Sequence, residues 1–327
     1  MKHLSDAPKG IVDLKELSED PGPYCMSFGF DLGPLVRSIK KWGLLFPPLV
    51  VKNESGKMDV VVGFRRVLAL KSLKWDNAPI IDLTGKKLTG LDLLLLNFYD
   101  NLAVRSFNDV EKGMILNRLK SHLPEKVLRD KYLPLLGIPA RESLYRTYES
   151  LEGLDSGIKV ALADGRLPFK TVKALLDIDL EYRSIFFEWI KDLRFNVNQQ
   201  SFFIETTLDI SMNEDKKISQ LLGEAPLLRI KEDERLNNPQ KARQLLAYLR
   251  SRRFPTLSNS EKAFKKRIGS LGLPVNVKIS YPPFFEHPEY RLEIFFNNGK
   301  RLEETIKTLA DSNALGNIGD PWEEVKE

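Results

Sequence analysis

One junction, between residues 58 and 73, constrains the fold most, because a strand there passes into a helix through a single glycine. Met58–Val62 is rich in valine, as strands are, and Val67–Leu73 has the composition of a helix. Between them stands Gly63-Phe64-Arg65-Arg66. Glycine lets backbone N–H groups approach an anion, a helix N-terminus adds positive partial charge, and arginines offer paired donors. The junction therefore predicts a site for a phosphate chain, although ordinary solvated turns often share this pattern.

The segments around this junction predict a small α+β domain that ends near residue 120. A helix over 35–42 has Leu35, Ile39 and Trp42 on one face, and Gly43 follows it as a helix stop. Strands are expected at 49–51, 58–62 and 79–83, and further helices begin near residues 67 and 91. Proline, glycine and aspartate in residues 1–30 indicate an irregular lead-in with one short strand at most.

The rest of the chain is expected to be helical and then to end in a small segment with strands. From about 110 to 225 helical spacing continues, with breaks at glycine and proline, which is typical of a helix-turn-helix domain. Alternation over 275–279 and 290–295 predicts two strands, and 299–310 predicts a helix. Two strands and a helix are too little to bury a core alone, so we expect this end to pair with a second copy.

Composition excludes several classes of protein. The 327 residues are enough for two or three domains, and no stretch approaches the roughly 20 apolar residues of a membrane helix. The N-terminus lacks the apolar run of a signal peptide. The single cysteine, Cys25, excludes an internal disulfide and a multi-cysteine zinc site, and three separated histidines argue against a histidine-rich metal centre. We therefore expect a cytoplasmic protein with no membrane partner.

Positive charge gathers in one segment. The chain carries a net charge of +5, but residues 229–267 hold twelve basic and four acidic residues, a net +8 that leaves −3 for the remainder. Such a block is typical of a linker that faces a polyanion. A solvated helix face would give the same count, and charge alone favours that simpler interpretation.

A second motif, Asp100-Asn101-Leu102-Ala103-Val104-Arg105, is followed by Glu111. Adjacent carboxylate and amide oxygens suit a hard cation such as Mg²⁺ held against phosphates. Arg105 stands one helical turn after Asn101 and could neutralise the same charge. The alternative is a helix start, with Asp100 or Asn101 as the N-cap and Arg105 in a surface ion pair.

Taken in order, these motifs resemble the N-terminal domain of the ParB chromosome and plasmid partition family. The similar segments are SIKKWGLLFPPLVV at 38–51, GFRR at 63–66, and DNLAVR at 100–105 with Glu111. Residues 151–176 are similar to the family's segment after its recognition helix, and Lys265–Leu309 resembles its C-terminal dimerisation domain. The resemblance covers most of the chain outside the first thirty residues and the stretch near 180–235.

The resemblance implies an α+β fold in four parts. These are a ParB/sulfiredoxin-like nucleotide-binding domain over 1–120, an all-α helix-turn-helix DNA-binding domain over 121–228, a basic linker over 229–264, and a small ββα-type dimerisation domain over 265–327. It also implies a dimer that closes as a CTP-dependent clamp on double-stranded DNA at a palindromic, centromere-like site. A ParA-type ATPase as partner and association with the nucleoid would follow from the same family.

The resemblance also assigns residues to the nucleotide and its metal ion. Asp100 and Asn101 would take the metal side, with Mg²⁺. The residues that would bind CTP are Ser38, Gly43, Pro47, Gly63, Arg65, Arg66, Asn101 and Arg105.

This sequence departs from the family pattern at positions that bear on the hydrolysis of CTP. The glutamate of the family's GERR is Phe64 here, which cannot ligate a cation, and the glutamate of its ENxxR is the shorter Asp100. An arginine usual before the first helix has no match in residues 20–31. The pattern thus predicts nucleotide binding and leaves slow CTP hydrolysis to CDP and phosphate open. The alternatives are a ParB-fold DNA-binding adaptor or transcription regulator without turnover, and a ParB-like nuclease.

DNA reading is assigned to a recognition helix over 139–150. Pro139 replaces the family's usual serine, Pro134 falls within the preceding helix, and the alignment there needs one extra residue. Individual side chains on this helix reach base edges or phosphates, or are simply solvent-exposed polar groups. The candidates are Arg141, Ser143, Tyr145 and Arg146.

Overall fold

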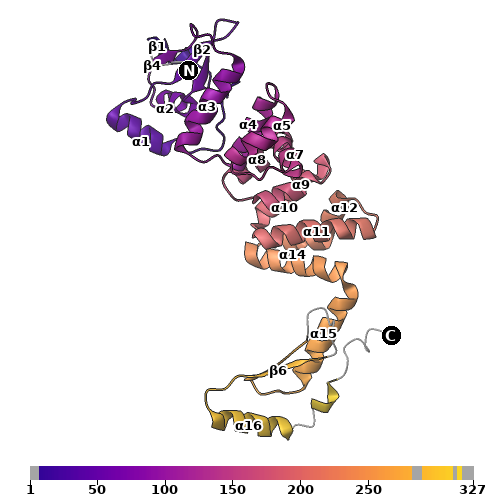
Figure 1. The fold of residues 1–327 in the computed structure, drawn as a ribbon. Helices are drawn as coiled ribbons and strands as arrows, with labels where there is room; N and C mark the ends of the chain where they lie inside the picture. The colour runs from indigo at the N-terminus through magenta and orange to yellow at the C-terminus, as the bar shows by residue number, and fades with distance from the viewer. Residues whose placement is uncertain (1–6, 282–288, 312–314, 319–327) are drawn as a thin grey trace. The chain divides into compact units, whose positions relative to one another are not determined.

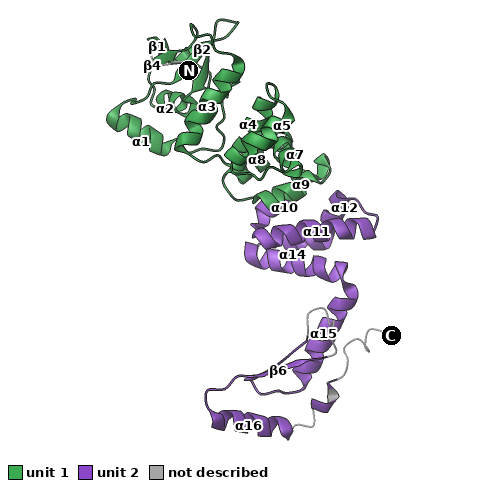
Figure 2. Cartoon of the chain, viewed as in Figure 1, with its two compact units in different colours: residues 1–187 green, residues 188–327 purple. Residues whose placement is uncertain are grey.

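The computed structural model describes residues 7–281, 289–311 and 315–318, and the chain forms two compact units, residues 1–187 and 188–327 (Figures 1 and 2). The first unit contains a four-stranded sheet with its helices, and then a group of short helices. The second unit contains longer helices and a two-stranded sheet. The boundary between the units falls within one helix, α10 (Leu180–Leu193).

The sheet of the first unit has the strand order β1-β4-β2-β3. β1 pairs antiparallel with β4, and β2 pairs antiparallel with β3, whereas β2 and β4 run parallel. The three strands expected from the sequence are confirmed within about two residues, and β1 is the short strand of the lead-in. The strands are β1 (Lys9–Asp13), β2 (Leu49–Lys52), β3 (Met58–Val62) and β4 (Asn77–Asp82).

The inner strands bury both of their faces, because adjacent side chains along a strand point to opposite sides of the sheet. Val50 and Ile80 pack in a cluster with residues of α1 and α2, whereas Val51 and Ile81 pack in a second cluster with residues of α3. The sheet is therefore the middle layer between two sets of helices. These helices are α1 (Gly33–Trp42), α2 (Phe64–Ser72) and α3 (Gly90–Val104).

The short helices of the first unit gather around α4, which packs against α7 and α8. Gly113 on α4 allows the close approach of α7, because a Cβ there would lie 2.7 Å from the Tyr148 carbonyl oxygen. The helices are α4 (Asp109–Lys120), α5 (Glu125–Val127), α6 (Leu133–Leu135), α7 (Glu142–Ser150), α8 (Ser156–Ala163) and α9 (Phe169–Leu176), with the one-turn 3-10 segment η3 (Leu151–Gly153). Another 3-10 segment, η1 (Leu14–Glu16), follows β1 and packs with the sheet.

The helix before α7 contains a wider turn. α5 continues through a π-helical segment, η2 (Leu128–Tyr132), into α6. The N–H of Leu133 bonds to the carbonyl of Leu128, five residues earlier, instead of the usual four. A single inserted residue produces such a turn, and it stands just before Pro134, which has no N–H to donate. The wider turn is thus accommodated without breaking the helix.

The helices of the second unit include a stretch that the sequence does not mark as helical. α11 and α14 pack side by side (Figure 1), with Phe203 and Ile210 of α11 and Leu245 and Leu249 of α14 buried. Most residues of the basic linker expected over 229–264 lie in helices. The helices are α11 (Val197–Asn213), α12 (Ile218–Leu222), α13 (Ala225–Glu232), α14 (Asn238–Arg253) and α15 (Pro255–Ser270).

The last described residues form the strands and the helix expected from the sequence. β5 (Val277–Ser280) pairs antiparallel with β6 (Arg291–Ile294), and α16 (Gly299–Ala310) follows, with a short turn η5 (Leu315–Asn317). Phe264 of α15 packs on Tyr281 and Tyr290, at centroid distances of 5.0 and 5.3 Å. The proline-containing connection between the strands lies outside the described residues over 282–288.

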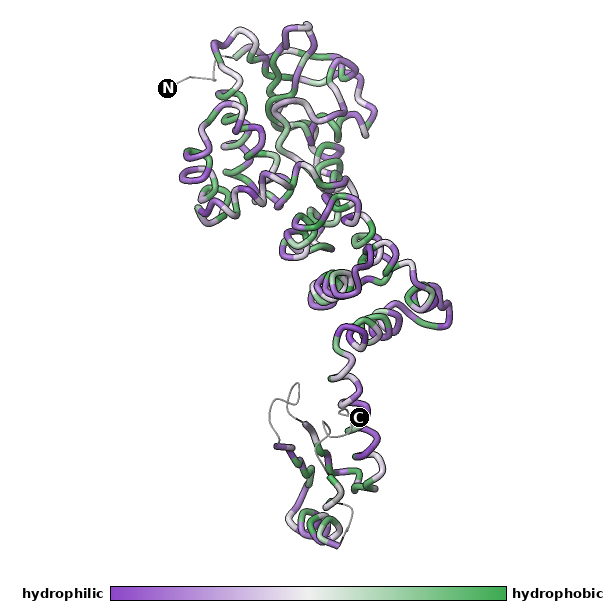
Figure 3. The backbone as a smooth tube through the Cα atoms, turned by 90° about the vertical axis from the view of Figure 1, so that its right-hand side faces the viewer, coloured by the Kyte–Doolittle hydropathy of each residue, from purple (hydrophilic) through white to green (hydrophobic). Residues whose placement is uncertain are grey.

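Polar residues interrupt the apolar ones along the helices of both units (Figure 3). Over the described ranges, no helix is long and apolar enough to cross a membrane.

Candidate anion-binding site

The turn between β3 and α2 is built around Gly63. Its φ of +99° lies in the left-handed region, where glycine is favoured. A Cβ at this position would lie 3.1 Å from Pro48 and 3.2 Å from the Arg66 guanidinium, so space as well as conformation requires glycine. The N–H groups of Arg66 and Val67 donate to the Gly63 carbonyl at 2.8 and 3.1 Å, whereas no described residue accepts from the N–H groups of Phe64 and Arg65 at the start of α2. The turn therefore presents unpaired donors at the positive end of a helix.

A pocket of about 140 Å³ opens beside this turn. An engineered cavity of roughly 150 Å³ holds a benzene molecule, so this space suits one phosphate-sized group better than a whole nucleotide. The walls come from the segment before α1, from the start of α2 and from the last turns of α3. The lining residues are Met26, Ser27, Leu35, Gly63, Phe64, Arg65, Arg66, Asn97, Asp100, Asn101, Val104 and Arg105.

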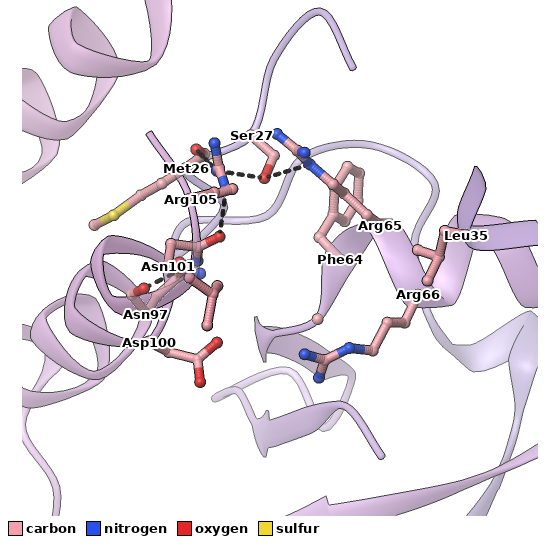
Figure 4. A pocket seen from close by; sticks show the side chains of 12 residues that line it. Met26, Ser27, Leu35, Phe64, Arg65, Arg66, Asn97, Asp100, Asn101 and Arg105 are labelled. Carbon is pink, nitrogen blue, oxygen red and sulfur yellow. Dashed lines mark hydrogen bonds between the residues drawn. The ribbon is translucent and has the colours of Figure 1, made fainter. Parts of the chain in front are cut away.

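Arg66 and Asp100 extend into the open part of this pocket from α2 and α3 (Figure 4). Arg66 is half-buried, and no described acidic residue forms an ion pair with it. Asp100 is exposed and lies in the last turn but one of α3. The pocket thus holds one arginine that is available for an anion and one carboxylate that is available for a cation.

The other two arginines of the pocket share one buried carboxylate. Glu111, 1% exposed at its side chain, accepts from Arg65 Nη2 at 2.8 Å and from Arg105 Nη1 at 2.6 Å. Its two oxygens also accept the backbone N–H groups of Phe28 and Asn108, each at 3.1 Å. Glu111 therefore has four donors, which leaves it no free lone pair directed at the pocket and makes it an anchor for the arginines.

All three side-chain nitrogens of Arg105 are already bonded to protein atoms. Nε donates to Asn101 Oδ1 at 2.8 Å, Nη1 donates to Glu111, and Nη2 donates to the Met26 carbonyl at 3.1 Å and to Ser27 Oγ at 3.3 Å. The contact with phosphate expected for Arg105 stays a prediction, and in this structure its donors are used by protein atoms. Arg105 ties α3 to α4 and to the segment before α1.

Asn97, Asn101 and Arg105 form a ladder along one face of α3, at intervals of four residues. Asn101 Nδ2 donates to Asn97 Oδ1 at 2.6 Å, and Asn97 Nδ2 donates to the Tyr24 carbonyl at 2.9 Å and to the Val61 carbonyl. The alternative of a helix start at Asp100 or Asn101 is wrong, because α3 begins ten residues earlier, with Thr89 as its cap. Asn97 was not predicted as a site residue. Its spacing of four residues from Asn101, which is visible in the sequence, was the signal that could have found it.

Arg65 differs from Arg66 in its surroundings. Burial lowers the pKa of the Arg65 guanidinium, and the nearby positive charge of Arg105 lowers it further, while the Glu111 carboxylate opposes both effects. Arg65 also lies over the Phe30 ring, 4.5 Å from its centroid. Its Nη1 has no partner among the described residues, so Arg65 is held in place with part of its guanidinium still available.

Three residues assigned to the nucleotide by the family resemblance do not line the pocket. Ser38 is exposed on α1, Gly43 ends that helix with a φ of +78°, and Pro47 stands in the connection to β2. None of the three is among the described residues that form the pocket wall. Leu35, one turn before Ser38, is the α1 residue that reaches the pocket.

Phe64, which stands where the family has glutamate, packs into the core. It is 6% exposed, belongs to the cluster formed with α1 and the sheet, and meets the Phe30 ring edge-on at 6.5 Å. An apolar ring offers no ligand for a metal ion and no base for a water molecule. Phe64 therefore stabilises the start of α2 instead of supplying chemistry to the pocket.

The nuclease alternative needs a cluster of metal ligands. Glu111 is occupied by four donors, and the described residues contain no group of three or more histidine, cysteine, aspartate or glutamate side chains that could hold a metal ion. Asp100 is thus a single carboxylate in this pocket.

The candidate DNA-reading residues separate into three kinds. Arg141, the N-cap of α7, and Ser143 in its first turn are exposed. Tyr145 is a correction: it is 1% exposed and packs in the core, so it cannot reach DNA in this structure. Its spacing with Tyr148 and Leu151, three residues apart on one face, is the core signal that the sequence analysis passed over.

Arg146 is exposed but surrounded by carboxylates. It lies 3.0 Å from Glu125, 3.5 Å from Glu149 and 3.8 Å from Glu142. A phosphate would have to displace or tolerate these acidic groups, so Arg146 is a weaker DNA candidate than Arg141.

The basic block over 229–267 is partly neutralised by acidic residues. Among the described residues, five of its basic side chains form ion pairs, but Asp233 and Glu261 already enter the net +8, so only the partners outside the segment lower it further. The pairs are Lys231 with Asp192, Arg235 with Asp233, Arg250 with Glu261, Arg252 with Glu214 and Glu224, and Arg253 with Asp209.

The fold and the pocket define an α+β domain with a glycine turn beside a pocket, joined to a set of short helices. No family model matches the sequence, and no curated protein matches it. The chain is similar to solved structures of ParB chromosome-partitioning proteins, and the similarity at these identities concerns the fold alone.

Three of these structures share 14 to 20% of their residues with this chain. The C-terminally truncated ParB from Caulobacter crescentus complexed with CTP-γ-S is 20% identical, with 54% of this chain and 97% of that chain covered and a TM-score of 0.27. The same truncated protein complexed to the centromeric parS site is 18% identical, with 60% and 98% covered and a TM-score of 0.32. A Pnob8-like ParB-N domain is 14% identical, with 74% and 97% covered and a TM-score of 0.32.

Proposed function

We propose that this chain is a ParB-like DNA-binding partition protein that binds CTP with Mg²⁺ at the turn from Gly63 to Arg66. The observation that carries the proposal is that one pocket holds Arg66 together with the N–H groups of Phe64 and Arg65, which have no partner among the described residues. Arg66 has no acidic partner among the described residues, whereas Arg65 and Arg105 are held by Glu111. A phosphate there would receive backbone and guanidinium hydrogen bonds together.

The pocket volume supports a phosphate chain that enters one end while the rest of the nucleotide lies outside. The walls at Gly63 and Arg66 take one phosphate, and the exposed Ser38 and the half-buried Pro47 are within the stretch expected to meet the remainder. The base contacts that would select CTP over other nucleotides belong to this outer part.

Mg²⁺ fits the residues present. It binds proteins through one or two carboxylates and takes its other ligands from water and substrate phosphates. Asp100 supplies one exposed carboxylate on the pocket wall. Asn101 is a poorer candidate, because its Oδ1 already accepts from Arg105 Nε at 2.8 Å. The ion would lower the repulsion between Asp100 and a bound phosphate.

The second candidate function is a DNA-binding adaptor or regulator without nucleotide turnover. Phe64 favours it, because this buried ring replaces the family's glutamate and leaves no second carboxylate beside Asp100. Slow hydrolysis of CTP to CDP and phosphate would have to proceed with Asp100 alone. Binding and turnover are therefore separate questions for this chain.

The dimer is proposed to form through the last part of the second unit. A two-stranded sheet is marginal by itself, and large apolar side chains on β6, after it and on α16 are exposed. Leu292 is 49%, Phe295 61%, Phe296 53% and Ile306 50% exposed. A second copy of the chain that covers these residues would complete the core.

Double-stranded DNA is the proposed macromolecular partner, with a palindromic, centromere-like site read by two copies of α7. Arg141 and Ser143 are the exposed candidates on that helix. A dimer whose reading helices are related by two-fold symmetry matches a palindrome. A ParA-type ATPase partner and a location at the nucleoid remain predictions from the family resemblance.

The experiment is a calorimetric titration of the purified full chain with CTP, ATP and GTP in Mg²⁺, followed by phosphate release with and without DNA. Selective CTP binding supports the proposal, and slow phosphate release would add hydrolysis. CTP binding without release indicates a switch that is reset by nucleotide exchange. If no nucleotide binds and DNA does, the adaptor function replaces the proposal.

A further inference from the structure

β1, the first strand of the first unit, has one side that no other described strand covers. It stands at one end of the sheet order, next to β4 (Figure 1). The N–H of Leu14, just after β1, donates to the Asp76 carbonyl at 2.9 Å, and hydrogen-bonded pairs alternate along an antiparallel ladder. Residues 10 and 12 therefore turn their backbone groups toward β4. The N–H groups that point to the uncovered side are those of Lys9, Ile11 and Asp13.

The two edges of this sheet differ. β3, at the opposite end of the sheet order, has a neighbour on its outer side, because Leu17 forms an isolated parallel bridge with Met58. Over the described ranges, no such bridge reaches the outer side of β1. Ile11 there is 79% exposed, and Pro79, opposite it on β4, is exposed as well. A large aliphatic side chain on an unpaired edge favours pairing with another strand.

The sequence of β1, Lys9-Gly10-Ile11-Val12-Asp13, carries opposite charges at equal distances on either side of Ile11. When two β1 strands pair antiparallel about Ile11, Lys9 of each copy lies directly opposite Asp13 of the other, and the outward backbone groups of both strands are in register. Opposite charges in facing positions stabilise a strand pair, whereas in-register parallel pairing places like charges side by side. β1 is thus complementary to itself in one arrangement.

Both charged side chains of β1 are placed for such a contact. They lie on the same face of the sheet as Ile11, because side chains alternate along a strand. Lys9 is exposed. Asp13 is held in place by the turn that follows β1, since Asp13 Oδ1 accepts the Lys15 N–H at 2.9 Å. The second oxygen, Oδ2, remains for a lysine of another chain.

We propose that β1 pairs antiparallel with β1 of a second copy of this chain, about a two-fold axis at Ile11, so that the two sheets become one continuous sheet. This surface belongs to the first unit and needs neither nucleotide nor DNA, so it is additional to the contact proposed above for the second unit. One strand pair is a small interface, and the association is therefore weak and depends on the protein concentration. Two self-complementary surfaces on one chain would join dimers into larger assemblies.

Ile11→Cys traps this contact as a disulfide. Directly opposed residues of a hydrogen-bonded antiparallel pair have Cα atoms about 5.5 Å apart, within the range that a disulfide spans. The full chain is oxidised mildly with copper–phenanthroline, and the covalent dimer is measured on non-reducing gels over time. Cys25, 1% exposed, is present in every protein, so the wild type gives the background. Glu54→Cys is the matched control, because Glu54 is exposed in the turn between β2 and β3.

A formed strand pair holds two thiols at a high effective concentration, so Ile11→Cys should cross-link at least about 10-fold faster than Glu54→Cys. Adding Lys9→Asp should lower the rate to that of the control, because two carboxylates then face each other across the strand pair. Exchanging both charges, Lys9→Asp together with Asp13→Lys, should restore fast cross-linking. Thermal unfolding of each variant shows that it is folded.

Cross-linking of Ile11→Cys that is no faster than the control overturns the proposal and leaves this edge to a strand of a different protein. Fast cross-linking that Lys9→Asp does not slow, or that the exchanged charges do not restore, overturns the antiparallel register. Repeating the experiment with Phe295→Ser and Phe296→Ser separates the two surfaces. Cross-linking through Ile11→Cys should persist there, and its loss would overturn a contact made by β1 alone.

Discussion

Arg65 on α2 donates a 2.8 Å hydrogen bond to Glu111 at the start of α4. The two residues are 46 positions apart in the sequence, and the same carboxylate also receives Arg105 at 2.6 Å. Glu111 is the N3 residue of a capping box in which Asn108 and Glu111 satisfy each other's backbone N–H groups. One side chain therefore starts a helix and fixes two arginines of the pocket.

Glu111→Gln should destabilise the first unit by about 2 kcal/mol, below the value for a fully buried pair because Arg65 and Arg105 keep some solvent contact. The variant leaves two guanidinium groups close together without a negative charge between them. Chemical denaturation of the full chain, followed by hydrogen exchange in the first unit, measures the change.

Glu54→Gln is the control for this variant, because Glu54 is an exposed residue in the turn between β2 and β3. It should unfold at the wild-type denaturant concentration. If Glu111→Gln also does so, the carboxylate does not anchor the arginines.

The recognition helix allows a contrast between two exposed arginines and a buried tyrosine. Arg141→Ala should weaken binding to double-stranded DNA. The slope of the logarithm of the binding constant against the logarithm of the salt concentration should fall by about one, as expected for a lost phosphate contact. Arg146→Ala should change DNA binding less, because three carboxylates already surround Arg146. Fluorescence anisotropy over a salt series measures both.

Tyr145→Ala should act on stability instead, by about 3 kcal/mol, as for other large buried aromatic residues. Thermal unfolding separates this effect from DNA binding. A stable Tyr145→Ala variant with weak DNA binding would return Tyr145 to the list of DNA contacts.

A pH dependence is expected in the second unit. Hydrogen bonds from Arg252, together with Lys216, lower the pKa of the Glu224 carboxyl to about 2, although partial burial opposes them. Because the folded pKa lies below the unfolded value, the stabilisation is present above about pH 4.5 and is lost as the pH falls toward 2. Hydrogen exchange in α11–α14 should therefore rise more steeply with acid in the wild type than in Glu224→Gln. If hydrogen exchange rises equally with acid in the two proteins, the Glu224 carboxylate does not stabilise the second unit in this way.

Dimerisation through the second unit predicts a change in oligomeric state. Phe295→Ser combined with Phe296→Ser should shift the protein from dimer to monomer in sedimentation velocity, since both side chains are more than half exposed. Met212→Ser is the control, because Met212 is 79% exposed on α11, outside this surface. A wild type that sediments as a monomer, or a double variant that remains a dimer, contradicts the assignment.

The sequence predicts those features that depend on neighbouring residues. The Gly63 turn follows from a strand, a glycine and a helix in direct succession. The structure confirms β3 before Gly63 and α2 after it. The strand pair and the helix near the C-terminus follow from local periodicity in the same way.

Features that depend on distant partners could not be predicted. The sequence shows that Arg105 stands one helical turn after Asn101. It does not show that Met26, Ser27 and Glu111 accept hydrogen bonds from the Arg105 guanidinium. The basic count over 229–267 likewise hides the fact that Asp192, Asp209, Glu214 and Glu224, outside this segment, neutralise several of its charges. Ion pairs across helices are set by packing, which a linear count does not contain.

The central claim is that the pocket binds the phosphates of CTP through Arg66, while Arg105 holds the fold. A calorimetric titration of CTP with Mg²⁺ into the wild type, Arg66→Ala and Arg105→Ala tests it, with thermal unfolding measured on the same samples. We predict at least about a 10-fold loss of CTP affinity in Arg66→Ala at unchanged unfolding temperature, and a lower unfolding temperature in Arg105→Ala. Wild-type affinity for CTP in a folded Arg66→Ala protein would contradict the account.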